Sequence, residues 1–219
     1  MLNTIEIIIK YREDFLIGLS VTIQMTIIIW IVGVTIGSIL GILGTKYSRS
    51  IGLLSKIVSF LLGGIPVLVF LYWLHYPFQT ILNIQIDGFY TTILTLSILN
   101  IFLVAEQVRN AVEQFPRDYI DSAEVCGFNS NEIIRKIQFP YILRQILPAI
   151  IFIQVVMMHS TLFASLISVD ELFRIASRVN SEIYKPVEVY STLAIFFLLI
   201  TLPITGFAYW LRKRYAFIK

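Results

Sequence analysis

The sequence predicts an all-α polytopic membrane protein with about five transmembrane helices and one charged, two-helix loop between the third and the fourth. Only 14% of the 219 residues are charged and 57% are hydrophobic, whereas soluble domains carry about 25% charged residues. Several separate apolar runs approach or exceed the roughly 20 residues that a helix needs to cross a bilayer. These runs are continuous, so they do not fit a membrane β-barrel, whose strands alternate apolar and polar residues.

The five predicted spans are long apolar runs. They are Leu16–Gly44, Ile51–Leu74, Phe89–Val104, Ile146–Ser168 and Val189–Leu211. In the first span, Gly33, Gly37 and Gly41 recur every four residues. Such a stripe of small residues lets two helices approach closely. It fits ordinary packing inside one chain, and it also fits a seam between two chains.

The second span contains the sequence Gly63-Gly64-Ile65-Pro66. Proline has no amide hydrogen to donate and glycine loosens a helix, so we expect a kink or a break at this point. Two interpretations fit such a break. It lines a pathway through the membrane, or it only accommodates packing.

The lysine and arginine residues predict the orientation of the chain. Five spans put the two termini on opposite sides of the membrane. Most of the 17 lysine and arginine residues fall on the side that holds the C-terminus and the charged loop. Because positive charge gathers on the cytoplasmic side, we expect a multi-pass protein of the cell membrane with its N-terminus outside and its C-terminus in the cytoplasm. The charged segment Asp170–Glu188 then lies outside, and mixed charge at helical spacing predicts a surface helix there.

The stretch from Arg117 to Pro148 is the one long segment that is too charged to cross a membrane. No helix breaker stands before Gly127, and glycine is a common cap at a helix C-terminus. Asn129 can start a second helix, with Glu132 three residues later completing a capping box. Pro140 is expected to end or kink that helix. The sequence therefore predicts two short helices joined at a glycine.

Two partners fit an amphipathic loop of this kind, a lipid surface or another protein. Acidic residues are as prominent in it as basic ones, which anionic lipid would disfavour. The first helix is small and polar around Ser122-Ala123, which suits close docking against a protein. The residues alone therefore favour protein docking over a helix resting on lipid headgroups.

The order Asp121-Ser122-Ala123, three residues, Gly127, and then Phe139-Pro140 resembles the EAA loop of type I ABC importer permeases. In that family the loop docks into a cleft of a cytoplasmic ATPase. The resemblance implies a single permease domain over residues 1–219, with residues 116–140 as its cytoplasmic coupling loop. The residues that it implies for ATPase coupling are Asp121, Ser122, Ala123, Glu124, Gly127 and Asn129. Asp121 and Ser122 stand where the family has Glu-Ala.

Motifs elsewhere in the chain resemble the polar amino-acid branch of these permeases, and most closely the M-type subunit of the histidine/lysine/arginine/ornithine pair. These motifs are Gly18–Thr22, Ala105–Arg109, His159–Thr161, Asp170–Leu172 and Tyr184–Pro186. The resemblance implies an inner-membrane importer of amino acids, polar or basic, that works by alternating access. It also implies separate ATP-binding subunits, a second and non-identical permease, and an extracytoplasmic substrate-binding protein. Where the family usually has Arg-Gly-Thr before its proline, this chain has Gly63-Gly64-Ile65.

The sequence contains no catalytic constellation and no phosphate-binding loop of the Gly-x-x-x-x-Gly-Lys-Ser/Thr type. We therefore expect no enzyme activity in this chain, no cofactor, no metal site and no nucleic-acid partner, so that ATP hydrolysis would belong to another subunit. Glu106 and Arg109 stand three residues apart on one helix face and are expected to pair, as a structural pair or as part of a cytoplasmic gate.

Polar residues inside the predicted spans are candidates for a substrate pathway, because such groups usually face a bundle interior or a cavity. The candidates are Gln24, Asn100, Gln154, His159, Ser160 and Thr161. Each also fits a simple contact between helices.

Two other functions remain open on the residues alone, an ion-coupled secondary transporter and a membrane scaffold without transport. A secondary transporter usually has acidic residues within its spans and an internal repeat. The predicted spans hold almost no acidic side chains, and the chain has no clear repeat.

Overall fold

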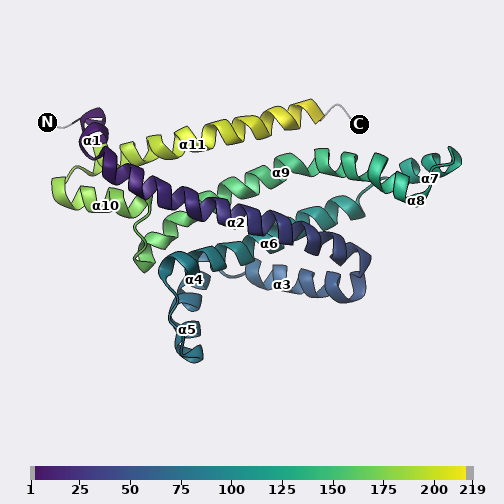
Figure 1. The fold of residues 1–219 in the computed structure, drawn as a ribbon, viewed down its shortest axis with the longest axis horizontal. Coiled ribbons are helices and arrows are strands. Elements are labelled where there is room, and N and C mark those ends of the chain that lie inside the picture. Colours follow the sequence, from purple (N-terminus) through teal and green to yellow (C-terminus); the bar gives the residue numbers. More distant parts are fainter. Residues whose placement is uncertain (1–2, 216–219) are drawn as a thin grey trace.

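The computed structural model describes residues 3–215, and every regular element in that range is a helix (Figure 1). The elements are α1 (Thr4–Lys10), α2 (Arg12–Lys46), η1 (Ser48–Gly52), α3 (Leu53–Gly63), α4 (Val67–His75), α5 (Pro77–Leu82), α6 (Gly88–Glu113), α7 (Arg117–Val125), α8 (Ser130–Glu132), η2 (Ile133–Gln138), α9 (Phe139–Ser160), η3 (Thr161–Ile167), α10 (Leu172–Ile183) and α11 (Pro186–Tyr215). The all-α prediction is therefore confirmed for this part of the chain.

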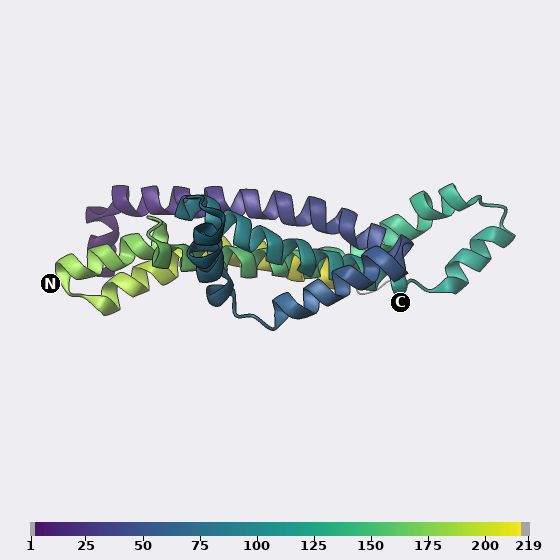
Figure 2. The ribbon, with the colours of Figure 1, turned by 90° about the horizontal axis from the view of Figure 1, so that it is seen from below.

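Within the described range, four helices are long and apolar enough to cross a membrane, and one bent pair can count as a fifth span. The four are α2, α6, the continuous run from α8 to η3, and α11. They lie along the long axis of the molecule, with α1 and α10 at one end and α7 and α8 projecting from the other (Figures 1 and 2). The expected number of about five spans is confirmed, although the helices extend beyond the predicted bounds.

The glycine stripe of α2 packs against α6 of the same chain. A Cβ on Gly37 would lie 2.7 Å from the carbonyl oxygen of Ile101, and one on Gly41 would lie 2.7 Å from that of Ala105. Both distances are far below ordinary contact, so only glycine lets the two helix backbones approach this closely. Of the two interpretations of the stripe, packing inside one chain is the one that the structure supports.

The second predicted span is broken, as the Gly-Gly-Ile-Pro sequence indicated. The helices before and after Gly64–Pro66 meet at an angle of 98°, and α4 and α5 turn away from the axis of the bundle (Figure 1). Pro66 adopts an extended backbone, with φ −56° and ψ 137°, which a helix cannot continue. The expected kink or break within the span Ile51–Leu74 is therefore confirmed.

The loop after α6 forms its first helix as predicted. Helix α7 ends before Gly127, which has a left-handed φ of +83°. Asn129 then caps the next helix, its side chain accepting from the Glu132 amide while the Glu132 side chain accepts from the Asn129 amide. This is the capping box that the spacing indicated.

Of the two predicted effects of Pro140, ending the second helix is not observed. The chain stays helical from Ser130 to Ile167, through Pro140 and Pro148. The π-helical segment η2 ends at Gln138, and Pro140 falls in the first turn of α9. Wider π turns change which carbonyl each amide would bond, so a residue without an amide hydrogen is tolerated there. The second loop helix is thus the beginning of the fourth span rather than a separate short helix.

An apolar cluster packs α10 against α1, α2 and α11. Leu172, Ile175, Ala176 and Val179 are buried on one face of α10, against Phe15 of α2 and other residues of α1 and α11. The predicted helix in the charged segment after the fourth span is therefore confirmed. It is packed into the bundle along one face and not merely solvated.

Candidate functional site

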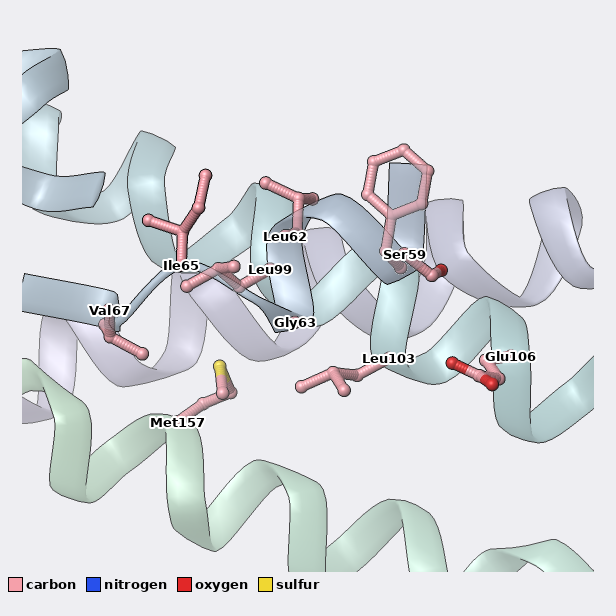
Figure 3. A pocket seen from close by; sticks show the side chains of 10 residues that line it. Ser59, Leu62, Gly63, Ile65, Val67, Leu99, Leu103, Glu106 and Met157 are labelled. Carbon is pink, nitrogen blue, oxygen red and sulfur yellow. The ribbon is translucent and has the colours of Figure 1, made fainter. Parts of the chain in front are cut away.

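A cavity of about 170 Å³ lies at the break in the second span, between that break and helices α6 and α9 (Figure 3). It is lined by Ser59, Leu62, Gly63, Ile65, Val67, Leu99, Phe102, Leu103, Glu106 and Met157. The broken backbone contributes one wall, which supports the interpretation that the break lines a pathway. Irregular backbone at membrane depth is tolerated where it faces protein or a cavity.

The cavity is apolar except at one end, where Ser59 and Glu106 lie (Figure 3). The hydroxyl oxygen of Ser59 is buried and has no hydrogen-bond partner among the described residues. Glu106 makes no ion pair or hydrogen bond within residues 3–215. The chain therefore leaves a carboxylate at the end of an otherwise apolar cavity without a cation of its own.

The expected pair of Glu106 with Arg109 does not form. Arg109 instead lies near Glu113, with 4.0 Å between Nε and the carboxylate, and Lys56 of α3 reaches the same carboxylate at 3.7 Å. Arg109 is only 2% exposed and packs beside Gly44 of α2. Burial against α2 separates this guanidinium from the cavity, and that is why Glu106 remains unpaired.

A second candidate site is the surface of α7 and the turn that follows it. Asp121, Ser122 and Glu124 are exposed, whereas Ala123 between them is buried. None of the polar side chains of α7 makes a hydrogen bond or an ion pair with the chain from residue 3 to 215. A Cβ on Gly127 would meet no atom within 4 Å. This surface is thus free to contact a partner.

Residues 33–217 match a protein family described as the binding-protein-dependent transport system inner membrane component. The chain belongs to this family. The permease is similar to HisQ, a histidine/lysine/arginine/ornithine transport system permease protein of Escherichia coli, with 26% identity over 213 residues that cover 91% of this chain and 92% of HisQ. It is also similar to the octopine transport system permease protein OccM of Rhizobium radiobacter, with 24% identity over 84% of this chain and 78% of OccM.

The M-type subunit is matched over a shorter stretch. HisM of Salmonella typhimurium is 32% identical over 115 residues, which cover 52% of the permease and 49% of HisM. Both members of that permease pair are therefore relatives of this chain.

Solved structures share the fold of the permease. One is described as a crystal structure of an amino acid ABC transporter with histidines, with a TM-score of 0.84, 23% identity, and coverage of 94% of this chain and 96% of that one. The MetNI methionine ABC transporter gives a TM-score of 0.73 at 18% identity. The permease is thus a multi-pass protein of the inner membrane, and ATP hydrolysis belongs to a separate subunit of such systems.

Two of the expected pathway residues join helices of the permease. The amide of Asn100 and the amide of Gln154 donate to each other, and Asn100 also donates to the Ile29 carbonyl at 3.0 Å. The Trp30 indole donates to the Gln154 carbonyl at 2.8 Å. Both amides are buried and their partners come from the chain, so these residues connect α2, α6 and α9 and do not line the cavity.

The other four expected pathway residues also lie outside the cavity lining. Ser160 and Thr161 donate to backbone carbonyls of their own helical run. His159 is exposed on α9 with its ring centroid 5.9 Å from that of Phe197, and Gln24 is exposed on α2.

Residue-by-residue reasoning missed Ser59 and Met157 as parts of the cavity. Ser59 stands four residues before Gly63, on the same face of a helix that leads into the break. A hydroxyl at that spacing from an expected helix break is the signal that could have found it. Met157 carries no such signal, because its place depends on how α9 packs.

Proposed function

We propose that the chain is the permease subunit of an ATP-driven importer of amino acids, and that its cargo carries a cationic group. The observation that carries the proposal is the unpaired Glu106 carboxylate at one end of the apolar cavity. Glu106 is half-buried, and an opposite charge beside it would stabilise a carboxylate that borders apolar surface. A protonated amine or guanidinium of the cargo would supply that charge, while the apolar lining would contact its hydrocarbon part.

Relatives support the class of cargo. HisQ is named for histidine, lysine, arginine and ornithine, and OccM for octopine. GlnP of Escherichia coli, 25% identical over 185 residues, is named for glutamine. A polar or basic amino acid fits these names, and Glu106 favours the basic ones.

The second part of the proposal concerns coupling to the ATPase. Residues 116–140 would be the cytoplasmic coupling loop of a single permease domain, 1–219, with Asp121, Ser122, Ala123, Glu124, Gly127 and Asn129 at the docking surface. The free polar side chains of α7 support this role. Because the chain is helical without a break from Ser130 to Ile167, movement of the docked loop would tilt a helix that contributes Met157 to the cavity. Alternating access would follow from that tilt.

The third part concerns orientation and partners. The distribution of lysine and arginine supports a C-terminus and a coupling loop in the cytoplasm, with α1 and α10 outside. A substrate-binding protein would then dock at the end that holds α10, and a second, non-identical permease would complete the pathway. The HisQ and HisM relatives support two permeases of different sequence.

The experiment is uptake into proteoliposomes that contain the permease with its ATPase, second permease and binding protein. Wild type should take up a basic amino acid only when ATP is present. Glu106→Gln should reduce uptake of the basic amino acid about tenfold or more, because the half-buried carboxylate no longer pairs with the cationic group, and should reduce glutamine uptake much less. Glu106→Asp keeps the negative charge at the same position and is the control, so it should retain clearly more uptake of the basic amino acid than Glu106→Gln.

Three results would contradict the proposal. Uptake driven by an ion gradient without the ATPase would favour a secondary transporter. Absence of uptake for every amino acid tested would favour a scaffold or another cargo. Equal uptake by Glu106→Gln and wild type would remove the cation-binding role.

A further inference from the structure

Three aromatic rings close a triangle where α6, α7 and α9 meet. Phe115 follows α6, Tyr119 belongs to α7, and Tyr141 belongs to the first turn of α9. The ring centroids are 6.0 Å apart for Phe115 and Tyr119, 5.2 Å for Phe115 and Tyr141, and 5.7 Å for Tyr119 and Tyr141. All three distances are typical of interacting aromatic pairs. We refer to these three residues as the aromatic triangle.

The aromatic triangle is the contact that ties α7 to both neighbouring spans. The polar side chains of α7 bond nothing else in the described part of the chain. Helix α7 also contacts η2, which leads into α9. Between α6 and α7 the chain is extended at Pro116, with φ −65° and ψ 126°, so the backbone there does not continue the helix. Side-chain contact must therefore fix the direction of α7 relative to α6.

The two helices that the triangle joins are also two walls of the cavity. Helix α6 contributes Leu103 and Glu106, and α9 contributes Met157. A displacement of α7 that is passed on through the triangle would act on both walls together. If the triangle were loose, α7 could move without moving α6.

We propose that Phe115, Tyr119 and Tyr141 are positioning residues that transmit movement of α7 to α6 and α9. The inference rests on the proposed function, in which α7 carries the contact with the ATPase. The rings do this work rather than the hydroxyl groups, because neither tyrosine hydroxyl makes a hydrogen bond in the described part of the chain. Phenylalanine should therefore replace either tyrosine without loss.

The test compares Tyr119→Ala and Tyr141→Ala with Tyr119→Phe and Tyr141→Phe in the complete transporter in proteoliposomes. The alanine variants should lower uptake about tenfold, within the usual range of coupling between linked sites. ATP hydrolysis and co-purification of the ATPase should stay near the wild-type level. The phenylalanine variants should keep uptake and hydrolysis together. A purely structural role would lower all three readouts in the alanine variants.

A matched control is Tyr47→Ala. Tyr47 is 48% exposed and Tyr119 is 46% exposed, yet the ring of Tyr47 contacts no other aromatic ring in the described range. Tyr47→Ala should keep wild-type uptake. If an alanine variant fails to insert in the membrane, Tyr119→Leu keeps an apolar side chain without the ring and takes its place in the comparison.

A second readout does not depend on transport. Cys126 is the one cysteine of the chain and is exposed, so a nitroxide label on it reports the mobility of the end of α7 in the permease alone. Tyr119→Ala should increase that mobility, and Tyr47→Ala should not. Unchanged mobility with unchanged uptake would overturn the inference, and so would equal losses in Tyr119→Ala and Tyr119→Phe. If Tyr119→Ala increased the mobility of the label but the wild-type transporter showed no ATP-dependent uptake, the role of the aromatic triangle would be supported. The proposed function would then be contradicted instead.

Discussion

The side-chain amides of Asn100 and Gln154 exchange two hydrogen bonds, of 2.8 and 3.0 Å, across the contact between α6 and α9. The two residues stand 54 positions apart in the chain. Both side-chain amides are buried. Removing either one leaves the other without its hydrogen-bond partner. This reciprocal dependence makes the pair measurable by a double-mutant cycle.

Asn100→Leu should destabilise the permease by about 1 kcal/mol, because it leaves the Gln154 amide buried without its partner. Gln154→Met should cost a similar amount. The double variant should lose clearly less than the sum, since no buried amide remains unpaired. Thermal unfolding in detergent measures all four proteins, and strictly additive losses would show that the two amides act independently.

Gly33→Ala should destabilise the contact between α2 and α6, because a Cβ at this position would overlap the Asn100 amide. The cost should be about 1–3 kcal/mol, as for other overpacked sites. Gly206→Ala on α11 is the matched control, since its Cβ would meet no atom within 4 Å. That substitution should be neutral or slightly stabilising in the same unfolding measurement. Equal behaviour of the two variants would contradict the close approach of α2 and α6.

Glu171 predicts a pH dependence of stability. Its side chain is fully buried and accepts from the Phe173 and Arg174 amides at the start of α10. Burial raises the pKa of this carboxyl to about 7, although the two amide hydrogen bonds and Arg174 act in the opposite direction. The folded protein therefore binds the proton more tightly than the unfolded chain, whose glutamate has the ordinary pKa of 4.5.

Glu171 stabilises the folded protein fully below about pH 4.5, and this stabilisation is lost as the pH rises through about 7. The Phe173 and Arg174 amides donate to different oxygens of Glu171, so Glu171→Gln keeps an acceptor for one of them and cannot ionise. Its melting temperature should therefore fall less than that of wild type between pH 5 and pH 8. Glu182→Gln should keep the wild-type dependence. A Glu171→Gln curve parallel to that of wild type would exclude this group as the source.

Gly127→Arg should abolish association with the ATPase and uptake while membrane insertion remains normal. Arginine is strained at a φ of +83° and would also add bulk to an open surface. Gly127→Asn is the informative control, because asparagine tolerates left-handed backbone far better than other residues. It should retain most of the association in a pull-down of the ATPase. Normal co-purification with Gly127→Arg would exclude this turn from the docking surface.

Much of the helical architecture could be predicted because its causes are local. Apolar runs locate the spans, and the sequence before Pro66 locates the break. The bounds could not be predicted, because α2 and α6 continue past the apolar runs into charged residues. The continuation of the helix through Pro140 follows a π-helical segment, and no single residue type predicts such a segment.

The site was harder to predict than the fold, because its geometry depends on residues distant in the sequence. Spacing on α6 allowed Arg109 to pair with either Glu106 or Glu113. Arg109 lies near Glu113 because Lys56 of α3 approaches the same carboxylate and because Arg109 is buried beside Gly44. In the same way, the polarity of Asn100 was visible in the sequence, whereas its satisfaction by Gln154 was not.

The unbroken helix from Ser130 to Ile167 has 38 residues. At 1.5 Å per residue it is about 57 Å long, nearly twice the roughly 30 Å of bilayer hydrocarbon. A large part of this helix therefore extends beyond the hydrocarbon region of the membrane. A rotation of about 10° about one end would carry the other end about 10 Å over a rod of this length. Nanometre-scale travel at the loop thus requires only a slight change of tilt within the lipid, where tight packing leaves little room for larger motion.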